Sequence, residues 1–197
     1  MPLDYAGMKL PRALLVSLAV LPALGFFVRS GAQEAQPAPR KPVAVFLLRH
    51  AETAAPTGAG ADPKLSEQGE ERAQDLARLL GKAGVTHLYA SEYARAQATL
   101  APLAGALGLA VETVPAAERE RQVDLLRGLP PGSVAVVAGH SNTVPALARG
   151  LGGELRELVE QPGQAPAFEH GSYDRLVLLT LPGDGGAPQT IELRYGD

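Results

Sequence analysis

The sequence predicts an α/β domain with a mostly parallel central sheet and helices on both faces of that sheet. Uninterrupted apolar runs such as VAVFLL (43–48) and SVAVVAG (133–139) are typical of strands buried on both sides. Segments with helical spacing of apolar residues lie between these runs, and this alternation is the pattern of parallel strands joined by right-handed crossovers. A Gly-Asp-Gly turn joins the last two apolar runs, which predicts an antiparallel hairpin at one edge.

The first strand, 43–48, is followed by a loop at 56–64 that is rich in glycine and proline. Ser66 can cap the start of the next helix, and Gly81 and Gly84 can end it. The helix at 93–108 is expected to be interrupted near its Pro102. The remaining predicted elements are strands at 85–91, 109–114, 133–139, 173–183 and 189–196, and helices at 117–129 and 142–153.

The composition restricts the kinds of site that the chain can form. Its 197 residues suit one domain with appendages, and 46% hydrophobic residues are enough for a real core. A formal net charge of −3 argues against a general nucleic-acid binder, so any anion site must come from locally placed arginines. The absence of cysteine excludes disulfides and thiolate metal sites.

The N-terminal segment differs from the rest of the chain. Lys9 and Arg12 precede an apolar run at 13–28, and small residues follow at 30–32, which is the pattern of an export signal. The segment can be cleaved, can stay as a membrane anchor, or can pack as a core helix. Translation from Met8 would give a more ordinary signal, and the sequence leaves that choice open.

The predicted organisation is therefore a signal peptide or anchor at 1–32, a linker at 33–42 and one folded domain at 43–197. We expect an exported protein, either periplasmic or secreted. Contact with a membrane is expected only if the N-terminal segment stays uncleaved.

Charged and titratable side chains follow the predicted central strands. Arg49 and His50 end the first strand, and His140 follows the strand 133–139. Arg95 lies one turn into the helix after the strand 85–91. Because ligands bind beyond the carboxyl ends of the strands in an open α/β sheet, these four side chains are expected to face one pocket.

This set of side chains predicts an anion site. Arginine grips phosphate with two parallel hydrogen bonds, and the free N–H groups at the start of the helix after His140 favour the same ligand. A neutral imidazole can then attack phosphorus, and cationic neighbours lower the pKa of a histidine so that it stays neutral. No pair of histidines has metal-binding spacing, so no metal site is predicted.

Three motifs resemble those of the histidine phosphatase superfamily, which includes the phosphoglycerate mutase-like enzymes. LLRHAET resembles its Arg-His-Gly motif with Ala51 in place of glycine, SEYARAQATLAPLA resembles its second motif, and VVAGHSNTV resembles its third. The resemblance covers residues 43–196 and implies a phosphoglycerate mutase-like fold. It also implies that His50 is the phosphorylated nucleophile and that Arg49, Arg95 and His140 complete the phosphate pocket.

Other candidate site residues are less clearly indicated by their motifs. Ser141 and Asn142 are candidate substrate contacts at the helix start, where Asn142 can instead be only a cap. Glu52 can orient an arginine or lie on the surface. Many members of the family donate a proton from a glutamate between the second and third motifs, and Glu118 is the best-placed candidate, although no recognisable acid motif surrounds it.

The expected function is hydrolysis of a phosphomonoester or a phosphoramidate through a phosphohistidine, with no metal or organic cofactor. The short chain most resembles the small phosphohistidine phosphatases, which have an open pocket. The expected partner is a phosphorylated small molecule or a phosphoprotein, and not a nucleic acid. Two alternatives stay open: a non-catalytic domain that binds phosphate or phosphopeptide, and a phosphoglycerate mutase, against which export argues.

Overall fold

The computed structural model describes residues 40–55 and 62–196 of the chain. The predicted signal or anchor at 1–32 and nearly all of the linker at 33–42 lie outside these residues, so the organisation of the N-terminus stays a prediction. In the part of the chain that is described, no helix is long and apolar enough to cross a membrane.

A six-stranded mixed sheet forms the centre of the fold, in the order β3-β2-β4-β1-β5-β6. Strands β3, β2, β4 and β1 are parallel neighbours, whereas β5 runs antiparallel to β1 and forms a hairpin with β6. The prediction of a mostly parallel sheet with a late antiparallel hairpin at one edge is confirmed. The strands are β1 (Val43–Arg49), β2 (His87–Ala90), β3 (Val111–Thr113), β4 (Val134–Gly139), β5 (Arg175–Leu181) and β6 (Gln189–Arg194).

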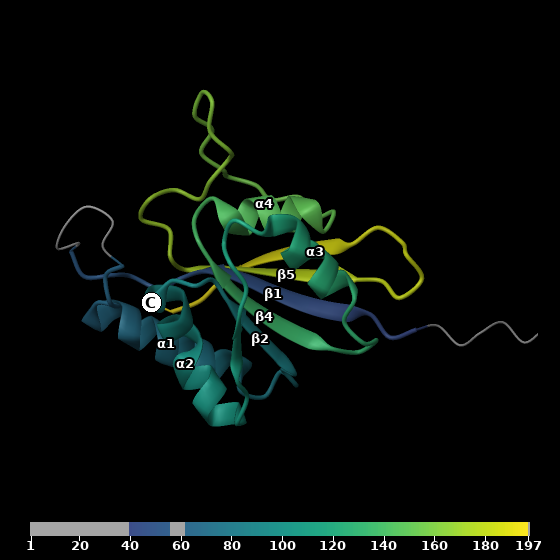
Figure 1. Ribbon diagram of the computed structural model, residues 1–197, viewed down its shortest axis with the longest axis horizontal. Helices are drawn as coiled ribbons and strands as arrows, with labels where there is room; N and C mark the ends of the chain where they lie inside the picture. The colour runs from purple at the N-terminus through teal and green to yellow at the C-terminus, as the bar shows by residue number, and fades with distance from the viewer. Residues whose placement is uncertain (1–39, 56–61, 197) are drawn as a thin grey trace, which may run out of the picture. The chain divides into compact units, whose positions relative to one another are not determined.

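The helices cover both faces of the sheet, with α1 and α2 on one face and α3 and α4 on the other (Figure 1). Ser66 caps α1 as predicted, because its Oγ accepts a hydrogen bond of 3.2 Å from the Gly69 N–H. Gly108 ends α2 in the left-handed conformation, at a φ of 66°. The helices are α1 (Glu67–Leu80), α2 (Ala94–Leu107), α3 (Arg119–Arg127) and α4 (Thr143–Gly150).

Alternate residues of the central strand belong to two separate cores. Val45 and Leu47 of β1 pack in the core beneath α3 and α4, whereas Leu48 packs in the core beneath α1 and α2. Both faces of β1 are therefore buried, which explains why its sequence is a continuous apolar run. Arg49, the last residue of β1, lies at the edge of the sheet where the parallel strands end.

The prediction that α2 is interrupted near Pro102 is wrong. The helix runs without a break from Ala94 to Leu107 and contains Pro102 in its interior. A proline normally costs a helix one hydrogen bond and causes a steric clash. Here Leu100 and Leu103, which flank it, are fully buried against the sheet, so tertiary packing outweighs the local preference.

Candidate active site

The register of β1 and β4 brings the two predicted histidines together. Arg49 pairs with Gly139 in the parallel ladder, and the His50 N–H donates to the Gly139 carbonyl over 2.9 Å. The rings of His50 and His140 consequently lie with centroids 5.3 Å apart and planes 65° apart. Two imidazoles that are 90 positions apart in the chain therefore share one site at the carboxyl edge of the sheet.

A glycine before His140 allows the chain to turn sharply into α4. A Cβ atom on Gly139 would lie 2.8 Å from the Thr143 Oγ1. That same hydroxyl accepts a hydrogen bond of 2.8 Å from the His140 N–H. The bond fixes the backbone at His140 and places the start of α4 directly after the ring.

The local hydrogen bonds of His50 fix which ring nitrogen is free. Its Nδ1 lies 2.8 Å from the Ala51 carbonyl oxygen, so Nδ1 carries the proton and donates it. The Nε2 atom of the neutral ring then holds the lone pair. The Ala51 N–H donates to the Thr99 Oγ1 over 2.9 Å, which anchors the peptide after His50 to α2. The ring is therefore presented with its nucleophilic nitrogen free and its backbone held.

The environment of His50 keeps it uncharged. Burial lowers the pKa of His50 to about 4, and the charge of Arg49 contributes in the same direction, although the hydrogen bond to the Ala51 carbonyl opposes it. The residue is only 6% exposed. At neutral pH the ring is thus a neutral base, as nucleophilic attack requires.

His140 is held by two polar side chains and is also neutral. Its Nε2 lies 2.9 Å from the Ser91 Oγ, and its Nδ1 lies 3.4 Å from the Arg95 Nη2. Because a guanidinium only donates, Nδ1 accepts and Nε2 carries the proton. Burial lowers the pKa of His140 to about 4, and Arg95 lowers it further, against the opposing charge of Glu92.

Arg49 is fixed by the segment before β5. Its Nη1 donates to the His170 carbonyl over 2.6 Å, its Nη2 donates to the Tyr173 hydroxyl over 3.1 Å, and its guanidinium lies 3.9 Å from the centre of the Tyr173 ring. The Arg49 Nε is buried and has no hydrogen-bond partner among the described residues. A buried N–H without a partner is costly, so this donor is available to an anion.

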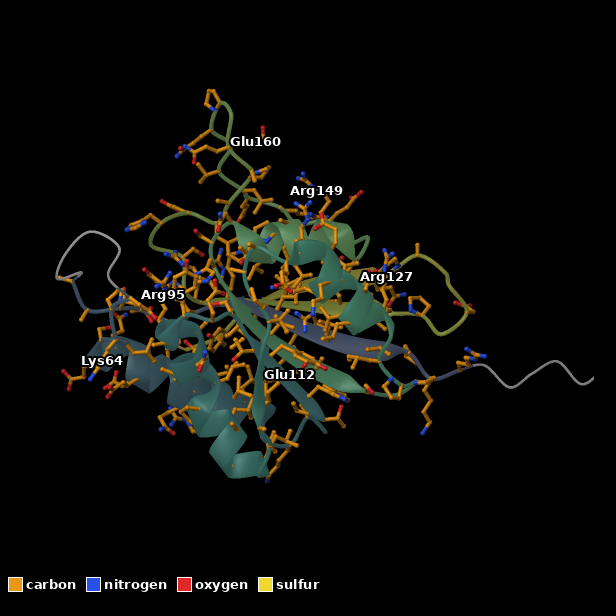
Figure 2. All side chains as sticks on the ribbon, viewed as in Figure 1. Lys64, Arg95, Glu112, Arg127, Arg149 and Glu160 are labelled. Atoms are coloured by element: carbon orange, nitrogen blue, oxygen red, sulfur yellow. The ribbon has the colours of Figure 1, made fainter. Side chains whose placement is uncertain are left out.

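Arg95 lies at the carboxyl edge of the sheet, as Figure 2 shows, and is held by Asp62 and Tyr93 in addition to its contact with His140. Its Nη1 donates to the Asp62 Oδ1 over 2.8 Å, and its guanidinium lies 4.3 Å from the centre of the Tyr93 ring. The Asp62 Oδ2 accepts from the Ala94 N–H over 2.5 Å. Although partial burial opposes the effect, these bonds hold the pKa of Asp62 below its usual range, so it stays ionised beside Arg95.

The structure does not bring every predicted residue to this cluster. Glu52 pairs with Arg72, whose Nε lies 2.9 Å from both carboxylate oxygens, so the arginine that Glu52 orients is neither Arg49 nor Arg95. Glu118 lies before α3, pairs with Arg121 over 2.7 Å and is 43% exposed. In the described part of the chain, no hydrogen bond or ion pair joins Glu118 to the histidine pair.

The two candidates at the start of α4 lie next to His140. The Ser141 carbonyl accepts from the Phe168 N–H over 2.8 Å, which ties this turn to the segment before β5. Asn142 precedes α4, is exposed and makes no side-chain cap. Both residues border the site, and their contact with substrate stays a prediction.

Several residues of the site were not predicted to contact it, most clearly Tyr173, Tyr93 and Asp62. The Tyr173 ring lies 6.0 Å from the His50 ring, and the Tyr93 ring lies 4.9 Å from the His140 ring, edge to face. A signal for Tyr173 was present: an antiparallel β5 must begin at the edge where β1 ends. Asp62 lies in a loop without periodicity, and the sequence gives no comparable signal for it.

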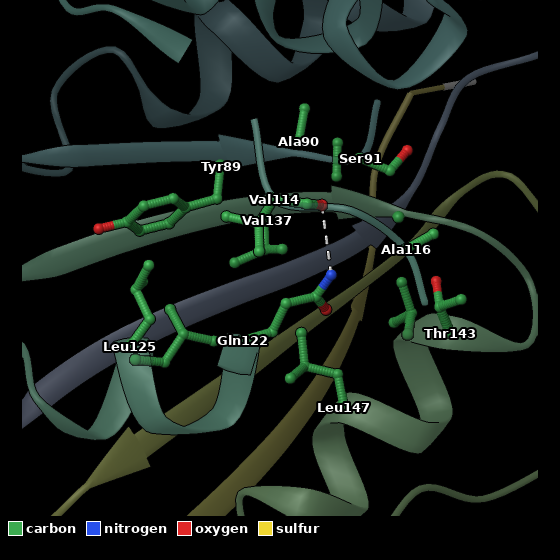
Figure 3. Close-up of a pocket in the computed structure, with 14 residues that line it drawn as sticks. Tyr89, Ala90, Ser91, Val114, Ala116, Gln122, Leu125, Val137, Thr143 and Leu147 are labelled. Atoms are coloured by element: carbon green, nitrogen blue, oxygen red, sulfur yellow. Dashed lines mark hydrogen bonds between the residues drawn. The ribbon is translucent and has the colours of Figure 1, made fainter. Parts of the chain in front are cut away.

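A mainly apolar pocket borders the site between the sheet, α3 and α4 (Figure 3). Ser91, Ala116 and Thr143 lie toward one end of it, and Tyr89 and Leu125 toward the other. The Gln122 amide donates to the Val114 carbonyl over 3.4 Å across this space. Among the described residues, no group of three or more histidines and acids is placed to hold a metal ion.

Fold and site together define a class of protein: a mixed α/β domain with two neutral histidines and two fixed arginines at the carboxyl edge of its sheet. The model of the histidine phosphatase superfamily (branch 1) matches residues 45–136, so the family resemblance predicted from the motifs is confirmed. No curated protein sequence matches the chain.

Solved structures show the same fold. The protein histidine phosphatase SixA, complexed with tungstate, has a TM-score of 0.57 at 20% identity and covers 77% of this chain and 96% of its own. The native mycobacterial glucosyl-3-phosphoglycerate phosphatase has a TM-score of 0.56 at 17% identity, over 77% of this chain and 98% of its own. A protein described as mycobacterial hydrolase 2 has a TM-score of 0.54 at 18% identity, and the match covers 78% of this chain and 89% of its own. The predicted phosphoglycerate mutase-like fold is confirmed.

Proposed function

We propose that this protein is a phosphatase that hydrolyses a phosphomonoester or a phosphoramidate through a phosphohistidine at His50. The observation that carries the proposal is the neutral His50 ring, with Nε2 free, 5.3 Å from the His140 ring. The buried Arg49 Nε has no hydrogen-bond partner among the described residues, and a phosphoryl oxygen bound beside the two rings is the acceptor that we propose for it. The expected substrate is a phosphorylated small molecule or a phosphoprotein.

In the proposed reaction the His50 Nε2 attacks phosphorus, and the bond from phosphorus to the leaving group breaks. Negative charge on the other phosphoryl oxygens is stabilised by Arg49 and Arg95, and His140, which contacts both Arg95 and Ser91, holds the Arg95 guanidinium in place. Water then attacks phosphorus, and cleavage of the P–N bond returns the neutral imidazole and inorganic phosphate. Because the donors are fixed before substrate arrives, little reorganisation is needed in the transition state.

The solved structures support an oxyanion ligand for this site. SixA was determined with tungstate, and the mycobacterial glucosyl-3-phosphoglycerate phosphatase with VO3 and with inorganic phosphate. Both proteins are named as phosphatases and have this fold. The resemblance of the chain to the histidine phosphatase superfamily supports the same reaction class.

The test is release of nitrophenol from p-nitrophenyl phosphate between about pH 5 and pH 7, where a neutral histidine nucleophile can act. We expect turnover by the wild type and a loss of at least roughly 10³-fold for His50→Ala, as for other covalent nucleophiles. His87→Ala is the matched control, since this histidine lies on β2 beside Tyr89 and outside the cluster. Rapid quenching should also trap phosphate on His50.

The alternative of a non-catalytic binding domain predicts a different result. It predicts that the wild type binds inorganic phosphate without turning over any phosphate ester. A phosphoglycerate mutase would instead interconvert phosphoglycerates in a reaction that depends on bisphosphoglycerate. Absence of turnover together with intact phosphate binding would exclude the proposed phosphatase.

A further inference from the structure

The proposed reaction releases an alcohol or amine that must gain a proton, and the surrounding carboxylates differ in their ability to supply one. The charges of Glu52, Asp62 and Glu92 act on the arginines and histidines of the site. Glu52 is bound to Arg72, and Asp62 is bound to Arg95. A carboxylate held by a guanidinium favours its ionised form and is a poor proton donor.

Glu92 has no such cationic partner among the described residues. Its Oε2 accepts one hydrogen bond of 2.8 Å, from the Ala116 N–H. The residues on either side of Glu92 both contact His140. The Ser91 Oγ lies 2.9 Å from the His140 Nε2, and the Tyr93 ring packs edge to face on the His140 ring. Glu92 is therefore an exposed residue between two residues that contact His140, and its carboxylate forms no ion pair with any of the described residues.

The bond to Ala116 also places the Glu92 carboxylate at the connection between β3 and α3. This is the segment in which the sequence predicted a proton donor, two residues before Glu118. Strands β3, β2 and β4 are successive neighbours, so the residues that follow them lie side by side at one edge. Figure 3 shows Ser91 and Ala116 toward the same end of the bordering pocket.

We propose that Glu92 is the proton donor of this site and that it extends the substrate range to phosphate esters of unactivated alcohols. This inference rests on the proposed function. As the His50 Nε2 forms its bond to phosphorus, the P–O bond to the leaving group breaks, and the Glu92 carboxyl proton passes to that oxygen. The Glu92 carboxylate then takes a proton from the water that attacks the phosphohistidine, which restores both groups.

The proposal predicts a dependence on the leaving group. Nitrophenolate leaves without a proton, whereas an alkoxide leaves only if it is protonated as the bond breaks. A glutamate that donates this proton is therefore needed for glycerol phosphate and hardly needed for p-nitrophenyl phosphate. A site without such a donor would be restricted to activated esters, acyl phosphates and phosphoramidates.

The experiment compares Glu92→Gln, Glu118→Gln and Glu112→Gln with the wild type on both substrates, following phosphate release. Glu112 lies on β3 and is exposed, so its variant is the matched control. We expect Glu92→Gln to lose roughly 10²–10⁴-fold in kcat/KM with glycerol phosphate and less than about tenfold with p-nitrophenyl phosphate. Retained hydrolysis of the activated ester shows that the variant is folded.

The possible outcomes separate this inference from the proposed function. Equal losses on both substrates for Glu92→Gln, or the selective loss appearing in Glu118→Gln instead, would overturn Glu92 as the donor while leaving the phosphatase intact. If the wild type depends on His50 and hydrolyses only the activated ester, no donor operates and the inference is again wrong. If the wild type hydrolyses neither ester, the proposed function fails and the inference fails with it.

Discussion

At the scale of single residues, the site depends on keeping two adjacent imidazoles uncharged. The rings lie 5.3 Å apart, so protonating either one disfavours protonation of the other, and Arg49 and Arg95 add to the effect. Burial is the largest cause for both rings. In the proposed reaction, the arginines that bind phosphate therefore also help to keep the His50 ring in its neutral, nucleophilic form.

We expect the acid limb of the pH–rate profile to lie near pH 4 and not near the ordinary histidine value of 6.5, because the pKa of His50 and that of His140 are both lowered to about 4. A lowered pKa means that activity persists as the pH falls through 6 and 5 and is lost only when the pair takes up a proton. The check is an NMR titration of the imidazole signals, assigned with His50→Gln. A transition of His50 near 6.5 would contradict the inferred burial.

The ion pair of Arg72 and Glu52 supports the segment that follows His50. The Arg72 side chain is 7% exposed and that of Glu52 is 13% exposed, and the Arg72 Nη1 also donates to the Tyr195 carbonyl over 2.7 Å. Arg72→Ala would leave the Glu52 carboxylate without its cation in a largely buried place. We expect a loss of about 3–5 kcal/mol in the free energy of unfolding, measured by urea denaturation.

A matched control for this prediction is Arg78→Ala. Arg78 pairs with Asp75 on the same helix, but its side chain is 70% exposed, so the expected loss is below about 1 kcal/mol. If the two variants lost similar amounts of unfolding free energy, burial of the Arg72–Glu52 pair would not contribute to stability.

At the scale of elements, α1 and α2 contain glycines in opposite circumstances. A Cβ atom on Gly69, in the first turn of α1, would overlap the Glu52 carbonyl oxygen, because the helix packs directly on the chain that follows β1. A Cβ atom on Gly105, inside α2, would have no atom within 4 Å. Only the first glycine is required by packing, and the second weakens its helix through conformational entropy.

Gly69→Ala and Gly105→Ala should therefore change stability in opposite directions. Gly69→Ala forces α1 away from Glu52, and we expect a loss of roughly 1–3 kcal/mol. Gly105→Ala should gain roughly 0.5–1 kcal/mol, since alanine favours a helix over glycine. Thermal unfolding of both variants beside the wild type tests the pair. A stabilising Gly69→Ala would contradict the close packing of α1 on this segment.

The elements also show which parts of the site can be read from the sequence. The pairing of His50 with His140 follows from two apolar strands that end in charged residues, because parallel neighbours finish at the same edge. The strands themselves were recognisable from their buried runs, although their ends differ by one or two residues from the prediction. The predicted interruption at Pro102 is wrong because the tendency of proline to break a helix is outweighed by tertiary packing, which the sequence does not show directly.

The remainder of the site depends on contacts that no local pattern encodes. Asp62 accepts a hydrogen bond from the Ala94 N–H at the start of α2, 32 positions further along the sequence. Tyr93, the N-cap residue, makes no side-chain cap of its own at this end of the helix. Arg49 is fixed mainly by backbone carbonyls at 169–172, and any residue type can supply a carbonyl. Such contacts become visible only once the chain has folded.

At the scale of the whole molecule, a chain with a net charge of −3 places two arginines next to the histidine pair. The global field therefore does not attract a phosphate, and binding depends on local donors such as the Arg49 Nε. A ligand that binds only the folded state stabilises it by mass action. Inorganic phosphate, a product of the proposed reaction, should consequently raise the melting temperature.

At a phosphate concentration near 100 times its dissociation constant, the expected stabilisation is about 2.7 kcal/mol, or a rise of roughly 5–10 °C in Tm for a domain of this size. Phosphate also stabilises proteins in general, because it is excluded from their surface. The wild type is therefore compared, at matched ionic strength, with Arg95→Ala, which lacks one of the two arginines of the site. The general effect should remain in that variant, while the additional shift should disappear. An equal rise in both proteins would mean that the cluster of His50, His140, Arg49 and Arg95 does not bind phosphate, and the proposed reaction would lose its basis.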